Sequence, residues 1–151
     1  MKICVDTVAL IDVLKDEYPS NQEKLYSALA ANETLIAPSV VYAELMPQFR
    51  GNKNQLNSFL KDHKITIDPL EVDSVSIAGT RWMKYLKRKS KIKCPKCGEA
   101  LDKKEHFLSD FYIGGFALAK CDVILTRDRG IYRKYFPELE NYEPVLQGNS
   151  R

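Results

Sequence analysis

Short apolar stretches typical of β-strands alternate with stretches of helical periodicity along most of this 151-residue chain. Lys2–Val5 begins the series with two β-branched residues, and helix-forming sequence separates each later strand from the one before it. Such alternation favours parallel strands joined by helical crossovers, and therefore an α/β domain with a mainly parallel sheet. The strands are predicted at 2–5, 34–37, 65–67 and 123–126.

Helices are predicted between these strands from the spacing of apolar residues. The clearest helix runs through Val75, Ala78, Trp82 and Leu86, which recur at three- and four-residue intervals. Residues 92–106 break the pattern with Pro, Gly and two close cysteines, which indicates an inserted loop. The other helices are predicted at about 10–14, 21–31, 38–45, 53–63, 108–120 and 131–136, and a loose tail is predicted at 137–151.

The composition fits a single globular domain, which we place at residues 1–136. With 44% hydrophobic and 28% charged residues, the chain can bury a core of ordinary size. No apolar run reaches the ~18 residues that a membrane helix needs. The first fifteen residues carry Asp6 and Asp12 in their apolar stretch and lack a small-residue cleavage site, which argues against a signal peptide. We therefore expect a cytoplasmic protein without a membrane segment.

Four carboxylates stand among apolar neighbours, where an unpaired charge is costly. Asp6 and Asp128 follow predicted strands, at the sheet edge where open α/β proteins bind ligands. Asp110 opens a helix, and Glu44 lies about one turn into another. Each alone has a structural explanation as a cap, a helix N-terminal charge, a turn residue or a solvated side chain. Together they predict one shared crevice, whereas Asp12 is predicted to face solvent.

Carboxylates gathered in this way repel one another strongly enough to require a cation. Two unit charges ~4 Å apart at an effective dielectric of ~20 repel by about 4 kcal/mol. An all-oxygen site favours Mg²⁺ or Mn²⁺ over zinc, and such an ion can activate water for attack on a phosphodiester. The chain has only two histidines, His63 and His106, and no zinc-protease, serine-hydrolase or nucleotide-binding motif. The predicted chemistry is metal-assisted phosphodiester hydrolysis.

Three motifs occur in order along the chain: VDTVALID, VVYAEL and SDFYIGGFALAKCDVILTRDRG. In this order they resemble the PIN-domain family of ribonucleases, including the VapC-type toxins of type II toxin–antitoxin pairs, over about residues 2–136. The resemblance implies a three-layer α/β/α sandwich around a parallel sheet, RNA cleavage with Mg²⁺ or Mn²⁺, and a homodimer. It also implies an acidic metal site formed by Asp6, Glu44, Asp110 and Asp128, with hydroxyl support from Thr7 and Thr126.

The chain departs from the family pattern at three further positions. Val8 stands where the family often has Ser or Asn, which removes a polar group near the implied site. Gly114 and Gly115 stand where the family commonly has Ala. Because a glycine within a helix costs about 1 kcal/mol relative to alanine, we expect this helix to pack closely beside the first strand.

The inserted loop contains the sequence CPKCG, which has the form of one zinc-ribbon knuckle. Cys94 and Cys97 would supply two thiolates, whereas a structural zinc ion takes four ligands. A second knuckle from a dimer partner could complete a site of four cysteines. The alternative is a free or oxidised pair at the surface. Within the same chain the other candidate ligands are His106 and, more weakly, Glu99, Asp102 and Glu105.

Basic residues gather ahead of this loop and around Asp128. From Arg81 to Lys96 there are eight basic residues and no acidic one, although the net charge is only +3. The pattern favours either contact with RNA phosphates or a solvated helix face. The candidate RNA-binding residues are Arg81, Lys84, Lys87, Arg88, Arg127 and Arg129.

These features together predict a Mg²⁺- or Mn²⁺-dependent endoribonuclease, and more specifically a toxin with an antitoxin protein as partner. Two alternatives stay open: an RNA-processing nuclease of the rRNA-maturation type, and a non-catalytic RNA-binding domain, which only Val8 supports. A phosphotransfer domain with Asp6 as acceptor fits less well, because a receiver-like domain needs two adjacent early acids and a late lysine.

Overall fold

Four parallel strands form the centre of the computed structural model, which describes residues 1–89, 94–99 and 107–145. The strands are β1 (Lys2–Val5), β2 (Thr34–Pro38), β3 (Ile65–Asp68) and β4 (Val123–Leu125), in the order β3-β2-β1-β4. Strand β1 lies between β2 and β4 and pairs with both in parallel register. The predicted strands and the mainly parallel sheet are confirmed, within a residue or two at each end.

Helices follow the strands as the alternating pattern predicted. Their bounds are α1 (Thr7–Lys15), α2 (Pro19–Ala30), α3 (Ser39–Leu45), α4 (Lys53–Asp62), α5 (Val72–Lys89), α6 (Leu108–Lys120) and α7 (Arg129–Tyr135), with a short 3₁₀ turn η1 (Met46–Phe49) after α3. Within the described residues, no helix is both long enough and apolar enough to cross a bilayer.

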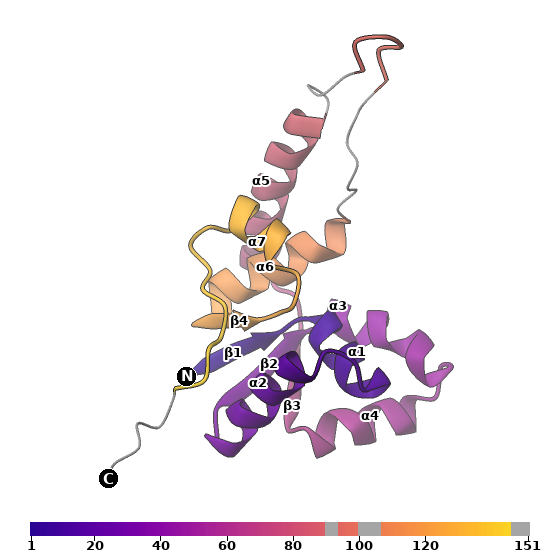
Figure 1. The fold of residues 1–151 in the computed structure, drawn as a ribbon, viewed down its shortest axis with the longest axis vertical. Helices are drawn as coiled ribbons and strands as arrows, with labels where there is room; N and C mark the ends of the chain where they lie inside the picture. The colour runs from indigo at the N-terminus through magenta and orange to yellow at the C-terminus, as the bar shows by residue number, and fades with distance from the viewer. Residues whose placement is uncertain (90–93, 100–106, 146–151) are drawn as a thin grey trace.

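The helices cover both faces of the sheet. Figure 1 shows α5, α6 and α7 together on one side and α1 and α2 on the other, which is the three-layer α/β/α arrangement. Helix α5 packs along α6 and then continues away from the sheet, so its C-terminal turns project from the body of the molecule (Figure 1). The segment 94–99 lies beyond that end of α5, remote from the carboxyl edge of the sheet.

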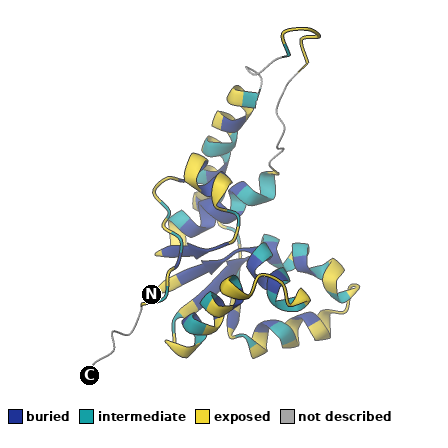
Figure 2. Cartoon of the chain, viewed as in Figure 1, coloured by how far each residue is buried: buried dark blue, intermediate teal, exposed yellow. Residues whose placement is uncertain are grey.

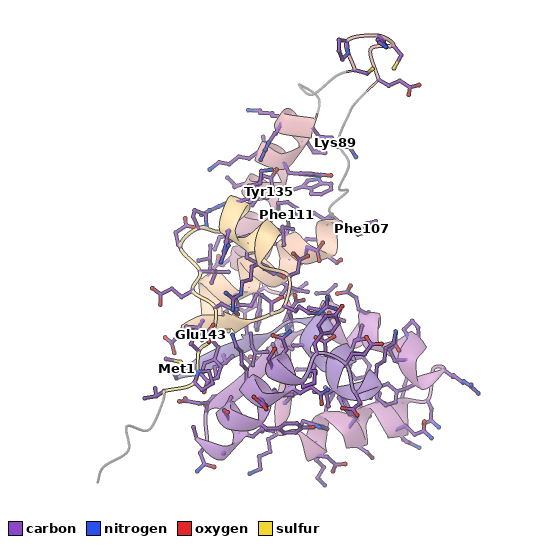
Figure 3. All side chains as sticks on the ribbon, in the orientation of Figure 1. Met1, Lys89, Phe107, Phe111, Tyr135 and Glu143 are labelled. Carbon is purple, nitrogen blue, oxygen red and sulfur yellow. The ribbon has the colours of Figure 1, made fainter. Side chains whose placement is uncertain are left out.

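The core runs through the sheet and into the α5–α6–α7 layer, where buried positions face inward (Figure 2). Strand β1 is buried along Ile3, Cys4 and Val5, as expected for a central parallel strand. Beside the sheet, Phe111 and Tyr135 lie close together with their ring centroids 5.4 Å apart (Figure 3). They belong to an aromatic cluster that also includes Trp82, Tyr85 and Phe136.

The two glycines of α6 are needed for close packing, but their neighbours are not those predicted. A Cβ on Gly115 would overlap the backbone carbonyl oxygen of Ser74 in α5. A Cβ on Gly114 would lie 2.6 Å from the ring of Phe136. Helix α6 does contact β1, as expected, but the closest neighbours of its two glycines lie in α5 and directly after α7.

Part of the segment after α7 pairs with the sheet, so the predicted loose tail is wrong for residues 140–142. Ile124 of β4 accepts a hydrogen bond from the amide of Tyr142 at 2.7 Å and donates its own amide to Glu140 at 3.0 Å. Tyr142 is only 5% exposed. These bonds cover the outer edge of β4, which would otherwise leave unpaired backbone groups.

Candidate functional site

Three of the four predicted carboxylates meet at the carboxyl edge of the sheet. Asp6 directly follows β1, Glu44 lies in α3 after β2, and Asp110 lies in the first turn of α6. Because parallel strands end at the same edge, residues that follow β1 and β2 are brought near one another. The charges of Glu44 and Asp110 contribute to the raised pKa of Asp6, and the charge of Asp110 contributes to the raised pKa of Glu44.

Asp6 is held by two short hydrogen bonds. The Thr126 hydroxyl donates to its Oδ2 at 2.6 Å, and the amide of Thr7 donates to its Oδ1 at 2.7 Å. Asp6 is only 4% exposed and is also the N-cap of α1. Thus the structural role as a cap and the predicted role in the site coexist, and both Thr7 and Thr126 contact the acidic group as expected.

Glu44 is oriented by hydroxyl groups in the same way. The Thr7 hydroxyl donates to its Oε1 at 3.0 Å, and Ser109 provides a further side-chain hydrogen bond. The Asp110 carboxylate receives the amide of Phe107 at 3.3 Å, so it also serves the N-terminus of α6. Ser109 was not singled out in the sequence, although its place directly before Asp110 could have suggested it.

The carboxylates of Asp6, Glu44 and Asp110 interact electrostatically. Burial raises the pKa of Asp6 from 3.8 to about 7, the bond from Thr126 opposes the rise, and the charges of Asp110 and Glu44 add to it. Burial also raises the pKa of Glu44, which Thr7 opposes and Asp110 reinforces. In both shifts burial is the largest cause, and the neighbouring carboxylates add to it.

Asp128 lies at the rim of this pocket. Its amide donates to the Thr126 hydroxyl at 3.1 Å, which in turn donates to Asp6. Asp128 is half-buried at the start of α7. The structure therefore links Asp6 and Glu44 through Thr7, shows an effect of the Asp110 charge on both, and places Asp128 directly before α7, linked to Asp6 through Thr126.

A buried tyrosine on α7 was missed by the sequence analysis. Tyr132 is 3% exposed, and its hydroxyl has no hydrogen-bond partner among the described residues. Burial raises the pKa of this hydroxyl, and the charges of Asp6, Asp110 and Asp128 contribute. Its position four residues after Asp128, one helical turn away, is the signal that could have identified it.

The donor set fits a hard divalent cation. Carboxylate oxygens from three elements converge, so an oxygen-seeking ion would relieve their repulsion. Within the described parts of the chain, no three His, Cys, Asp or Glu side chains stand in ready-made coordination geometry. Small side-chain rotations would therefore have to accompany binding.

The prediction that Asp12 faces solvent is wrong. Asp12 is fully buried in α1, and its Oδ2 lies 3.1 Å from Nε of Arg127. The guanidinium of Arg127 also stacks on Tyr18, 3.9 Å from the ring centroid. The partner is 115 residues away in the sequence, so local helical spacing could not reveal it. One of the predicted RNA-binding residues thus has a structural ion pair.

The other basic candidates fall into two groups. Arg81 is held by a bidentate pair with Glu138 and by the Tyr135 carbonyl, and Arg129 pairs with Glu143 at 3.0 Å. In contrast, the side chains of the remaining candidates are exposed on the projecting part of α5. These residues are Lys84, Lys87 and Arg88.

The order of the sheet, its helical layers and the acidic edge define an α/β protein with a PIN-like fold. A chain in the crystal structure of VapBC2 from Rickettsia felis, bound to a DNA fragment from their promoter, superposes with a TM-score of 0.65. The match covers 95% of this chain and 100% of that chain at 20% sequence identity, and it shows a common fold. No family model and no curated protein matches the sequence.

Proposed function

We propose that this protein is a metal-dependent endoribonuclease. The observation that carries the proposal is the convergence of Asp6, Glu44 and Asp110, buried or half-buried, where burial and, to a lesser extent, the neighbouring carboxylates raise the pKa of Asp6 and of Glu44. Buried carboxylates with raised pKa values at the carboxyl edge of a parallel sheet are typical of functional sites, and a bound divalent cation would stabilise their charged forms. The exposed basic residues on α5 are suited to a polyanionic substrate.

In this proposal Asp6, Glu44 and Asp110 hold the ion, with Asp128 at the rim. When bound, Mg²⁺ or Mn²⁺ would activate a water molecule and neutralise charge on the scissile phosphate. The residues around it have a separate task. Thr126 and Thr7 fix the two oxygens of Asp6 through their hydrogen bonds, and the Thr7 hydroxyl fixes Glu44, so the carboxylates are already oriented before substrate arrives.

The direct test is cleavage of a panel of structured RNAs with Mg²⁺ or Mn²⁺. Changing a residue that only orients a metal ligand typically costs 10–100-fold, so Asp110→Asn, which removes a ligand charge, should reduce cleavage by more than ~100-fold. Asp62→Asn is the matched control, because it makes the same change at an exposed position at the end of α4. Equal cleavage by wild type and Asp110→Asn would reject the proposal and indicate a contaminating nuclease.

We also propose that the nuclease acts as the toxin of a type II pair, with an antitoxin as protein partner. The support is the common fold with a chain of VapBC2. Induced expression of the wild type in a bacterial host should arrest growth, and Asp110→Asn should not. Co-expression of the product of the neighbouring gene should relieve the arrest and co-purify with the chain. Cleavage in vitro without growth arrest would favour the RNA-processing alternative instead.

A further inference from the structure

Two parts of the molecule lie apart from the acidic site. One is the predicted zinc loop, of which the structure describes Cys94 and Cys97. The third predicted ligand, His106, lies outside the described residues, as do Asp102 and Glu105, so zinc binding stays a prediction. The other part is the outer side of the edge strand β3, which pairs with β2 alone among the described strands.

A groove of about 620 Å³ runs along this outer edge of β3. Three successive residues of the strand line it: Ile65, Thr66 and Ile67. Because successive side chains of a strand point to opposite faces of the sheet, a groove that all three line must follow the backbone edge rather than one face. One face of α4 forms the facing wall, where the lining residues are Asn57, Leu60 and Lys61.

The backbone of β3 can pair with a further strand in this groove. Its ladder with β2 is the only strand pairing that β3 makes within the described residues. The outward amide and carbonyl groups of an edge strand are available to another chain. The opposite edge of the sheet is closed, since residues 140–142 pair with Ile124 of β4. The fold therefore covers one edge with an extended segment of its own chain and leaves the other edge open.

The groove carries positive charge beside apolar side chains. Lys61 and Lys64 both line it, both are exposed, and neither makes an ion pair with a described residue. Among the described residues that line the groove, none is acidic. The half-buried side chains of Tyr42 and Ile67 add apolar surface. A ligand that fits the groove therefore combines negative charge, apolar groups and a backbone that can pair with β3.

We propose that this groove binds an extended, acidic segment of a partner protein, which adds to β3 as a further strand. The open edge selects a polypeptide, because its amides and carbonyls alternate as the pairing requires. A nucleic acid could neutralise the lysines but has no such row of backbone donors and acceptors. Lys61 and Lys64 select acidic side chains, and the apolar lining accepts apolar side chains of the same segment. None of the four predicted metal ligands lines the groove, so the inference does not depend on the proposed nuclease activity.

The test is a nuclear magnetic resonance titration of the full chain, in the presence of chelator, with three probes. These are a decapeptide of alternating glutamate and valine, the same decapeptide with lysine in place of glutamate, and single-stranded oligouridylate. The acidic peptide should shift the amide resonances of residues 65–68 and slow the hydrogen exchange of the outward amides of β3. The lysine peptide should do neither, and binding of the acidic peptide should weaken as salt is added.

Charge reversal identifies the contribution of the two lysines. The double variant Lys61→Glu with Lys64→Glu should weaken binding of the acidic peptide by at least ~10-fold. Lys15→Glu with Lys53→Glu is the matched control and should bind as wild type. Both control lysines are exposed and lie outside the groove, and Lys15 stands in the last turn of its helix, as Lys61 does. Circular dichroism should show that both double variants remain folded.

Four results would overturn the proposal. Binding of neither peptide at millimolar concentration would show that the lysines only protect the edge from association. Equal binding by wild type and the Lys61→Glu, Lys64→Glu variant would remove the basis for an acidic partner. Tighter binding of oligouridylate at the same resonances would assign the groove to RNA, and a dimer that protects the same amides would assign it to a second copy. Asp110→Asn should bind the acidic peptide as wild type does, so this proposal and the nuclease proposal can fail separately.

Discussion

Asp6 and Asp12 are six residues apart, both buried at helix α1, and their surroundings differ completely. Asp12 faces the guanidinium of Arg127, which stacks in turn on Tyr18. Asp6 faces two hydroxyl or amide donors and the charges of Glu44 and Asp110. Asp12 is therefore paired with a cation inside the fold, whereas in the proposed function a bound cation would neutralise Asp6.

The raised pKa of Asp6 predicts a measurable dependence of the free energy of unfolding on pH. The pKa of Asp6 is raised from 3.8 to about 7, so the native state binds a proton more tightly than the unfolded chain. Stability should therefore fall as pH rises from about 4 to about 7, by on the order of 4 kcal/mol at most, and stay low above that range.

The largest expected loss of stability comes from breaking the ion pair between Asp12 and Arg127. Arg127→Met should lower the free energy of unfolding by about 3 kcal/mol, because it leaves the fully buried Asp12 without a cation. Urea unfolding at neutral pH measures the change. Asp12→Asn should cost less, about 1 kcal/mol, since the side chain of Arg127 is 38% exposed and can turn to water.

The double variant Asp12→Asn with Arg127→Met distinguishes loss of the ion pair from loss of packing. In the Asp12→Asn background, Arg127→Met should lower the free energy of unfolding by little more than the stacking contact with Tyr18 contributes. If the destabilisations of the two single variants simply add up in the double variant, the ion pair is not the reason that Arg127 stabilises the fold.

Replacing Asp6 should, in contrast, increase the free energy of unfolding. Asp6→Asn should raise the free energy of unfolding by about 2 kcal/mol at pH above 7 in the presence of a chelator, because it removes the poorly solvated charge. The gain should disappear below about pH 4, where Asp6 is protonated in both states. Thermal unfolding across this pH range gives the comparison, with Asp62→Asn as a variant that should show no pH-dependent difference. A loss of stability at high pH would mean that Asp6 is compensated in the fold.

The smallest effect concerns the hydroxyl beside the acidic pocket. Tyr132→Phe removes a buried oxygen that has no partner in the described structure, and should stabilise the protein by about 1 kcal/mol. Tyr42→Phe provides the contrast, because that hydroxyl donates to Asn57 at 2.8 Å near the surface. It should be neutral or slightly destabilising. Destabilisation by Tyr132→Phe instead would show that its hydroxyl makes a stabilising bond in solution.

Local patterns were sufficient to predict most of the fold. Each strand from β1 to β4 is a short apolar segment between helical segments, and parallel pairing follows from that alternation. The acidic residues were identified from their apolar context, and the parallel sheet explains why Asp6 and Glu44 meet. The Cys94–Cys97 turn was also visible, because Pro and Gly frame it in the sequence.

What could not be predicted depends on partners distant in the sequence. Asp12 has the spacing of a solvent-facing residue, and only tertiary structure brings Arg127 to it. A glycine within a helix, such as Gly115, indicates close packing, but the sequence does not identify Ser74 as its neighbour. Residues 140–142 pair with the edge of β4 through backbone hydrogen bonds, which leave little signal in the side-chain pattern.

Calorimetric titration of chelator-treated protein with Mn²⁺, at roughly pH 6 and roughly pH 8, tests the central claim most directly. Because Asp6 must lose its proton at a pKa of about 7 before it can bind an ion, wild-type affinity should be about tenfold higher at the higher pH. Asp110→Asn should bind weakly at both values, and Asp62→Asn should behave as wild type. Undetectable Mn²⁺ binding by the wild type, or equal affinity in Asp110→Asn, would contradict a cation site at the acidic edge of the sheet.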